Sequence, residues 1–182
     1  MHILLVQTAC NYHQVVLYSD ESGSENVIAD WHQDKPRETL SFLMKVLSEL
    51  EQFPKPELIV FVQGPGSFTA LRVGATWVNT FAYAQSVPIV SLNSLQFLAY
   101  LIHQDSKDLA LTFDQKRYFV QENGAVIATE QNPSGTVVNP DQIPVWFTSE
   151  HINKLSSLFS PPTKSTEVLY VIPPKITLPK ER

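Results

Sequence analysis

The chain has 182 residues, of which 43% are apolar, and a formal net charge of −5. This length suits one full domain or one domain with a small appendage, and the apolar content excludes wholesale disorder. Proteins that grip nucleic acid alone normally carry a basic face, so the acidic balance gives no support to autonomous tRNA or DNA binding.

Cys10 is the only cysteine, which excludes an intramolecular disulfide and fits a reducing cytosol. The apolar start is too short for a signal peptide and lacks a basic region before it. No run approaches the roughly 18 apolar residues of a membrane span. The sequence therefore predicts a soluble, cytoplasmic protein with no membrane contact.

The first hundred residues predict alternating strands and helices. Strands are expected at 3–8, 14–19, 26–31, 58–62 and 87–91, and helices at 36–53, 69–85 and 93–103. Asn93 or Ser94 is expected to cap the last of these helices. The resulting order, three strands in a meander followed by strands with crossover helices, is the RNase H-like order of an α/β fold.

The second half carries weaker signals. Strands are expected at 109–113, 117–122 and 125–129, with Asn123-Gly124 as a tight hairpin turn. A short helix is expected at 151–159, a last strand at 168–172 and an extended tail at 175–182. We divide the chain into an RNase H-like domain at 1–104 and a reduced second α+β domain at 105–182.

A glycine-rich turn, Gly64-Pro65-Gly66-Ser67-Phe68-Thr69, joins the buried fourth strand to the following helix. Its glycines permit positive φ and close backbone approach, and Ser67 or Thr69 can cap the helix. The free N–H groups of that helix could hold an anion, although the turn is neither a P-loop nor a dinucleotide fingerprint. On chemistry alone, a structural turn and an anion site are both open.

The string from Gly64 to Gly74, GPGSFTALRVG, resembles the GPGSFTGLRIG pattern of the TsaB (YeaZ) family. The segment 87–95 is similar to the family's IPLVGVSSLE region, residues 1–9 align with its ILAIDTS opening, and Tyr170 with the tail resembles its ending. The likeness is strong from about 58 to 98 and thin from about 105 to 165.

The resemblance implies a fold of the actin/Hsp70/sugar-kinase type (ASKHA) and a role as a non-catalytic scaffold subunit. TsaB-like proteins pair with TsaD, the catalytic subunit, and TsaE, an ATPase, joins them to modify adenosine 37 of tRNA to threonylcarbamoyladenosine. The implied partners are a TsaD-like protein in a heterodimer, a TsaE-like ATPase, a second copy when the chain is alone, and tRNA only through the complex. No cofactor is implied. The alternatives are a stand-alone ATP-binding enzyme of the superfamily and a diverged binding module without the TsaD partnership.

Three departures from the family pattern argue against intrinsic nucleotide chemistry. Gln7 replaces the acidic residue of the IDTS string and is a poor ligand for a hard cation. Ala70 replaces a glycine of the turn. Asp114 is either a shifted remnant of a later acidic position or a turn residue.

No metal or catalytic site is predicted. The histidines show no i, i+4 pair, the HxxxH motif of TsaD-like proteins is absent, and a metal site needs several converging ligands. His13 and His32 are expected at the surface near strand ends, and Cys10 at a turn.

The helices at 36–53 and 69–85 each show two apolar stripes, whereas a helix that covers one face of a sheet needs only one. Burial on two sides follows, either against each other and the second domain or against a partner. In the TsaB family the equivalent helices pack against those of TsaD, or of a second TsaB, as a four-helix bundle. The interface is then expected to include small residues that allow close approach and large apolar anchors: Leu43, Leu47, Ala70, Val73, Gly74, Trp77 and Phe81.

Overall fold

The computed structural model describes residues 1–21, 24–34, 36–103, 105–113, 116–141 and 161–171. Its first part is a five-stranded sheet in the order β3-β2-β1-β4-β5. The strands are β1 (His2–Gln7), β2 (His13–Glu21), β3 (Ser24–Gln33), β4 (Leu58–Val62) and β5 (Ile89–Leu92). The first three pair antiparallel, and β4 and β5 join them in parallel. This confirms the RNase H-like order.

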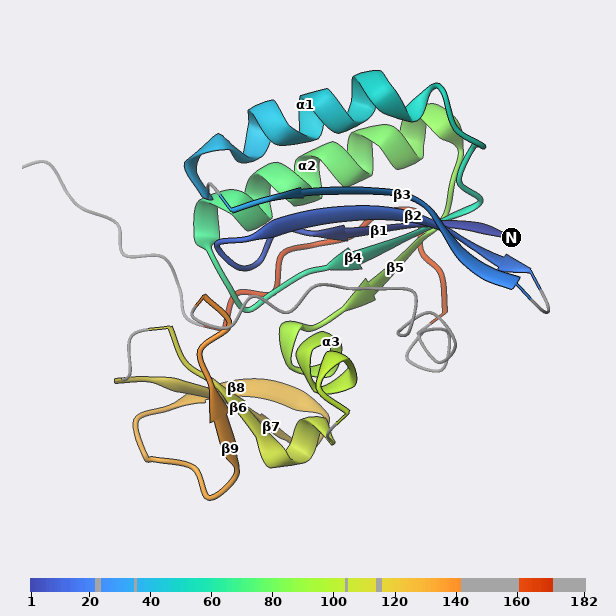
Figure 1. Cartoon of the computed structure of the whole chain (residues 1–182). Helices are drawn as coiled ribbons and strands as arrows, with labels where there is room; N and C mark the ends of the chain where they lie inside the picture. Colours follow the sequence, from blue (N-terminus) through green and yellow to red (C-terminus); the bar gives the residue numbers. More distant parts are fainter. Residues whose placement is uncertain (22–23, 35, 104, 114–115, 142–160, 172–182) are drawn as a thin grey trace, which may run out of the picture.

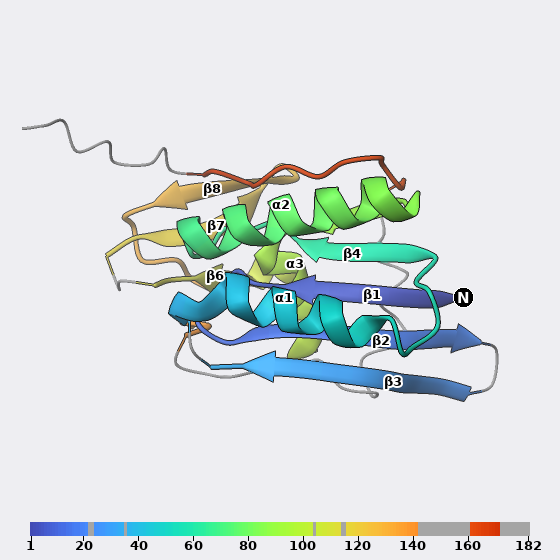
Figure 2. The ribbon, with the colours of Figure 1, turned by 90° about the horizontal axis from the view of Figure 1, so that it is seen from above.

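Two helices, α1 (Thr39–Leu50) and α2 (Phe68–Gln85), lie side by side over one face of this sheet (Figure 1, Figure 2). A short 3-10 turn, Pro36–Glu38, precedes α1. The helix α3 (Ser94–Leu101) lies on the opposite face. Asn93 caps α3 as expected, because its side chain accepts from the Gln96 amide and the Gln96 side chain accepts from the Asn93 amide.

The second sheet has the order β8-β7-β6-β9. Its strands are β6 (Leu109–Leu111), β7 (Tyr118–Glu122), β8 (Ala125–Thr129) and β9 (Thr136–Val138), with the 3-10 turn Ser106–Asp108 before β6. Asn123 and Gly124 both have positive φ, 50° and 82°, so the predicted hairpin turn is confirmed. The strand β9, which pairs in parallel with β6, was not predicted.

Two clusters of buried side chains make up the core. The larger fills the space between the five-stranded sheet and α1 and α2. The smaller joins the second sheet to α3 through Leu95, Leu98 and Ala99. Since Phe97 and Leu101 of α3 belong to the larger cluster, this helix packs against both sheets.

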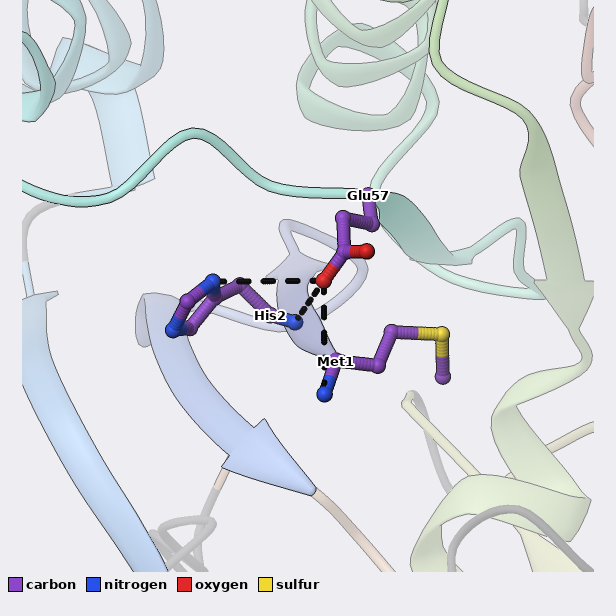
Figure 3. A network of polar contacts seen from close by, with 3 residues as sticks. All are labelled: Met1, His2 and Glu57. Atoms are coloured by element: carbon purple, nitrogen blue, oxygen red, sulfur yellow. Dashed lines mark hydrogen bonds and ion pairs between the residues drawn. The ribbon is translucent and has the colours of Figure 1, made fainter. Parts of the chain in front are cut away.

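The start of the first strand is tied to the loop before β4 by Glu57 (Figure 3). The Glu57 carboxylate accepts from the His2 amide at 2.8 Å and lies 4.0 Å from the Met1 amino group and 3.9 Å from His2 Nδ1. The Glu57 amide in turn donates to the His2 carbonyl at 2.8 Å. This exchange extends the pairing of β1 with β4 by one step.

Residues 161–171 form an extended segment along the outer side of α2, which we call the C-terminal strap (Figure 2). It contains no strand, so the expectation of one at 168–172 is wrong for its described residues. Only Thr163 pairs with the sheet, in an isolated antiparallel bridge to Ile89. The helix expected at 151–159 and the tail at 175–182 lie outside the described residues. In the part of the chain that the structure describes, no helix combines the length and apolarity that crossing a bilayer requires.

Candidate functional site

A groove of about 600 Å³ runs between α1 and α2 on the side that faces away from the sheet. Its walls come from one side of each helix and are mostly apolar: Leu40, Met44 and Leu47 from α1, and Arg72, Val73, Thr76, Trp77, Thr80, Phe81, Ala84 and Gln85 from α2. Leu40 and Met44 are 59% and 51% exposed, so large apolar side chains face water here. A groove with such walls is suited to hold apolar side chains of another protein.

Two aromatic rings form the rigid part of the wall. The rings of Trp77 and Phe81, one helical turn apart on α2, stack at 5.3 Å with an angle of 8° between their planes. Trp77 is 8% exposed, and its indole N–H has no acceptor among the described residues. Aromatic side chains held in this way are frequent anchors in protein interfaces.

The structure separates the residues predicted for the interface into two groups. Leu47, Val73, Trp77 and Phe81 line the groove. Leu43, Ala70 and Gly74 instead point into the protein. On α2 the division follows the helical period: Val73, Trp77 and Phe81 recur every four residues along the groove, whereas Ala70 and Gly74, also four apart, lie on the neighbouring stripe that turns toward the sheet.

Leu43 and Ala70 are 0% and 1% exposed, so neither is available to a partner. A Cβ on Gly74 would lie 2.4 Å from Thr8 Oγ1 and 3.2 Å from the Phe61 ring. Gly74 therefore allows α2 to approach its own sheet, and not a partner helix as the sequence suggested.

Leu40, Met44 and the polar residues of the groove were absent from the predicted interface. Met44 follows Leu40 by four residues, and Leu47 follows Met44 by three, so all three fall in one apolar stripe. This spacing was the available signal that Leu40 and Met44 lie beside Leu47. Arg72, Thr76 and Thr80 carry no apolar signal and could not be found in that way.

The glycine-rich turn is filled by the protein's own backbone. Gly64 has φ of 112°, and a Cβ on Gly66 would lie 2.1 Å from the Ala9 carbonyl oxygen. The Ser67 amide donates to that same oxygen at 2.7 Å. Ser67 is the N-cap of α2 but its side chain makes no capping hydrogen bond, and Thr69 is exposed. The Ser67 N–H, which an anion would need, is already used, so the geometry favours a structural turn.

Gln7, at the end of β1, is buried and bonded to the backbone around it. Its side-chain oxygen accepts from the Ala9 amide at 2.7 Å, and its nitrogen donates to the Tyr12 carbonyl at 3.4 Å. The space beside it, where the two sheets meet, measures only about 10 Å³, roughly what a single water needs. Gln7 therefore holds the loop after β1 together. Asp114 lies outside the described residues.

One expectation about a single residue is wrong. His13 is fully buried, and its Nε2 lies 2.8 Å from Thr39 Oγ1, so it joins β2 to the start of α1. Cys10 is also buried, and burial raises the pKa of its thiol well above the usual range. His32 is exposed as expected. Among the described residues no group of three or more His, Cys, Asp or Glu side chains could hold a metal ion.

Comparisons with known proteins find similarity to TsaD, TsaB and YeaZ. The sequence model of TsaD, tRNA N6-adenosine threonylcarbamoyltransferase, matches residues 36–122. The tRNA threonylcarbamoyladenosine biosynthesis protein TsaB of Bacillus subtilis is 26% identical over 100 residues, which are 54% of this chain and 44% of that protein. YeaZ from Pseudomonas aeruginosa superposes with a TM-score of 0.51 at 19% identity, covering 81% of this chain and 72% of the other. These matches show that the chain is similar to TsaB and YeaZ.

The match to the TsaD model contains the whole groove, the glycine-rich turn and α3. The sequence alignment with TsaB of B. subtilis spans less than half the length of that relative. The likeness to YeaZ establishes the shared fold. This chain is thus similar both to TsaB and YeaZ and to TsaD, and the match to the TsaD model includes the two helices that form the groove.

Proposed function

We propose that this protein is a non-catalytic scaffold subunit in the formation of threonylcarbamoyladenosine at position 37 of tRNA. In this proposal it pairs with a TsaD-like catalytic subunit, a TsaE-like ATPase joins the pair, and tRNA is bound only through the complex. The similarity to TsaB of B. subtilis supports the pathway. The groove between α1 and α2 is the observation that carries the role.

The groove supports a protein partner because its apolar side chains are turned outward. Burying Leu40 and Met44 together with the edges of Trp77 and Phe81 would remove apolar surface from water, at about 25 cal/mol per Å². A partner with two similar helices would complete a four-helix packing. Because the TsaD model matches the region that builds this groove, a TsaD-like protein is expected to present comparable helices.

The neighbourhood of Gln7 supports the absence of intrinsic catalysis in this proposal. The Gln7 amide is neutral and engaged with Tyr12 and Ala9, and the adjoining space is of the size of one water. A nucleotide needs a cleft of a few hundred Å³ with polar groups that converge on it. The groove, by contrast, is large and apolar, which suits a protein surface.

Met44→Asp tests the proposal. The side chain is half exposed, so the free protein should stay folded, whereas a carboxylate buried unpaired in an apolar interface is strongly unfavourable. We expect the variant to lose co-purification with the host's TsaD-like protein. Tyr83→Asp is the matched control, because Tyr83 is 89% exposed on α2 but lies outside the groove. Retention of the complex by Met44→Asp would refute the role of the groove.

We further propose the division into domains 1–104 and 105–182, with α3 as the shared element. Its side chains pack in both buried clusters, so the two sheets are expected to move little relative to each other. A homodimer of the chain alone and a cytoplasmic location stay predictions.

A further inference from the structure

The C-terminal strap is fixed to α2 and β5 by a set of hydrogen bonds centred on Thr166. The Thr166 amide donates to Asn79 Oδ1 at 2.8 Å, and Asn79 Nδ2 donates to the Thr166 carbonyl at 2.9 Å. The Asn79 side chain thus pairs with the strap as a neighbouring strand would. The Thr166 hydroxyl lies 2.6 Å from Ser91 Oγ of β5, and Thr166 is 5% exposed. The helix α2 is therefore held between α1 on one side and the strap on the other (Figure 2).

The strap is also anchored on both sides of Thr166. Thr163 exchanges two backbone hydrogen bonds with Ile89, at 2.7 and 2.8 Å. The Leu169 amide donates to the Gln63 carbonyl at 2.8 Å, and the Leu169 carbonyl lies near Gly64 of the glycine-rich turn. These bonds place the next residue, Tyr170, at a defined position at the start of α2.

Tyr170 completes a small exposed cluster at that end of the helix. Its ring lies 5.3 Å from the ring of Phe68, and the Arg72 guanidinium lies 5.4 Å from the Phe68 ring centre. Phe68 and Tyr170 are 38% and 46% exposed, so both rings present a free surface to water. Arg72 also lines the groove, which makes the cluster continuous with it.

We propose that the strap is the third element of the partner-binding surface, and that Tyr170 contacts the same protein that occupies the α1–α2 groove. This inference rests on the proposed function. Aromatic and arginine side chains are the types enriched in protein interfaces, and a ring held in place by its surroundings loses little entropy on binding. An aromatic pair with an arginine can also stack on nucleic acid bases. The apolar groove beside it and the net charge of −5 favour a protein.

The test is a titration of the full chain with the host's TsaD-like protein. Tyr170→Ala should weaken binding about tenfold, the loss typical of an interface anchor. Tyr170→Phe keeps the ring and should bind within about twofold of the wild type. Tyr83→Ala, which removes an exposed tyrosine from the other end of α2, should bind as the wild type does. The thermal midpoint of each free variant shows that folding is unchanged.

Asn79→Ala provides a second, independent test. It removes the two hydrogen bonds to Thr166 that hold the strap and leaves Tyr170 itself unchanged. It should weaken binding, and the Asn79→Ala/Tyr170→Ala double variant should bind no more weakly than the weaker single variant, because both act through one element. The Tyr170 and Tyr83 variants decide the proposal even where Asn79→Ala does not fold.

Each outcome has a separate meaning. If the wild type binds the TsaD-like protein and Tyr170→Ala binds it equally tightly, the inference is wrong and the proposed function stands. Absence of wild-type binding overturns both. If Tyr170→Ala binds the TsaD-like protein normally but reduces the binding of tRNA by the isolated chain, the cluster serves nucleic acid and the inference is wrong.

Discussion

Leu43→Ala is expected to lower the free energy of unfolding by about 2–5 kcal/mol, because the side chain is fully buried and its removal leaves a cavity. The adjacent substitution Met44→Ala should change it by less than about 0.5 kcal/mol, since Met44 is half exposed. Urea unfolding followed by circular dichroism measures both. The two substitutions distinguish the inner from the outer side of α1.

For binding of the partner, we expect the larger effect from Met44→Ala and the smaller one from Leu43→Ala. Met44→Ala should weaken the complex with the TsaD-like protein, because Met44 lines the groove, whereas Leu43→Ala should affect binding only through its lower stability. Measured at a temperature where both variants are folded, a loss of affinity confined to Leu43→Ala would contradict the orientation of α1 described above.

Gly66→Ala is the second substitution with a large expected effect. Its new Cβ would lie 2.1 Å from the Ala9 carbonyl oxygen and 2.8 Å from the Ala9 carbonyl carbon, both backbone atoms that cannot rotate away. We expect the free energy of unfolding to fall by about 2–4 kcal/mol, as for other overpacked backbone contacts. The hydrogen bond from the Ser67 amide to the same oxygen would be strained as well.

Ser67→Ala is the matched control for Gly66→Ala. Because the Ser67 side chain makes no capping hydrogen bond to α2, its removal should change the free energy of unfolding by less than about 0.5 kcal/mol. A large loss of stability in Ser67→Ala with little change in Gly66→Ala would show that the turn is organised by the cap and not by the close approach to Ala9.

The elements of the first hundred residues were predictable because their apolar residues follow clear periods. The consecutive apolar residues of β2 and β4 differ from the helical spacing in α1 and α2. The strand β9 has only three residues and no such period. Its position depends on pairing with β6, a contact between distant parts of the chain that a local pattern does not contain.

The candidate site was predictable in its place but not in its residues. Two apolar stripes on α1 and α2 indicated two buried sides, yet the stripes alone do not say which side faces the sheet. The sequence therefore predicts Leu43 and Gly74 in the interface, although Leu43 is in the core and Gly74 approaches Thr8. The strap was missed because its contacts, such as those of Thr166 with Asn79, come from side chains and isolated backbone bonds.

The most direct test of the central claim, that the α1–α2 groove binds the TsaD-like partner, is thiol labelling at introduced cysteines, since the chain has a single native one. Cys10 is buried, which limits reagent access and raises the pKa of its thiol, so we expect it to react slowly with maleimide in the folded state. Met44→Cys and Tyr83→Cys each add one exposed thiol, inside and outside the groove respectively. Labelling rates are measured with and without the TsaD-like protein. We predict that the partner slows labelling at position 44 and leaves position 83 unchanged; a complex that leaves position 44 as reactive as in the free chain would contradict the claim.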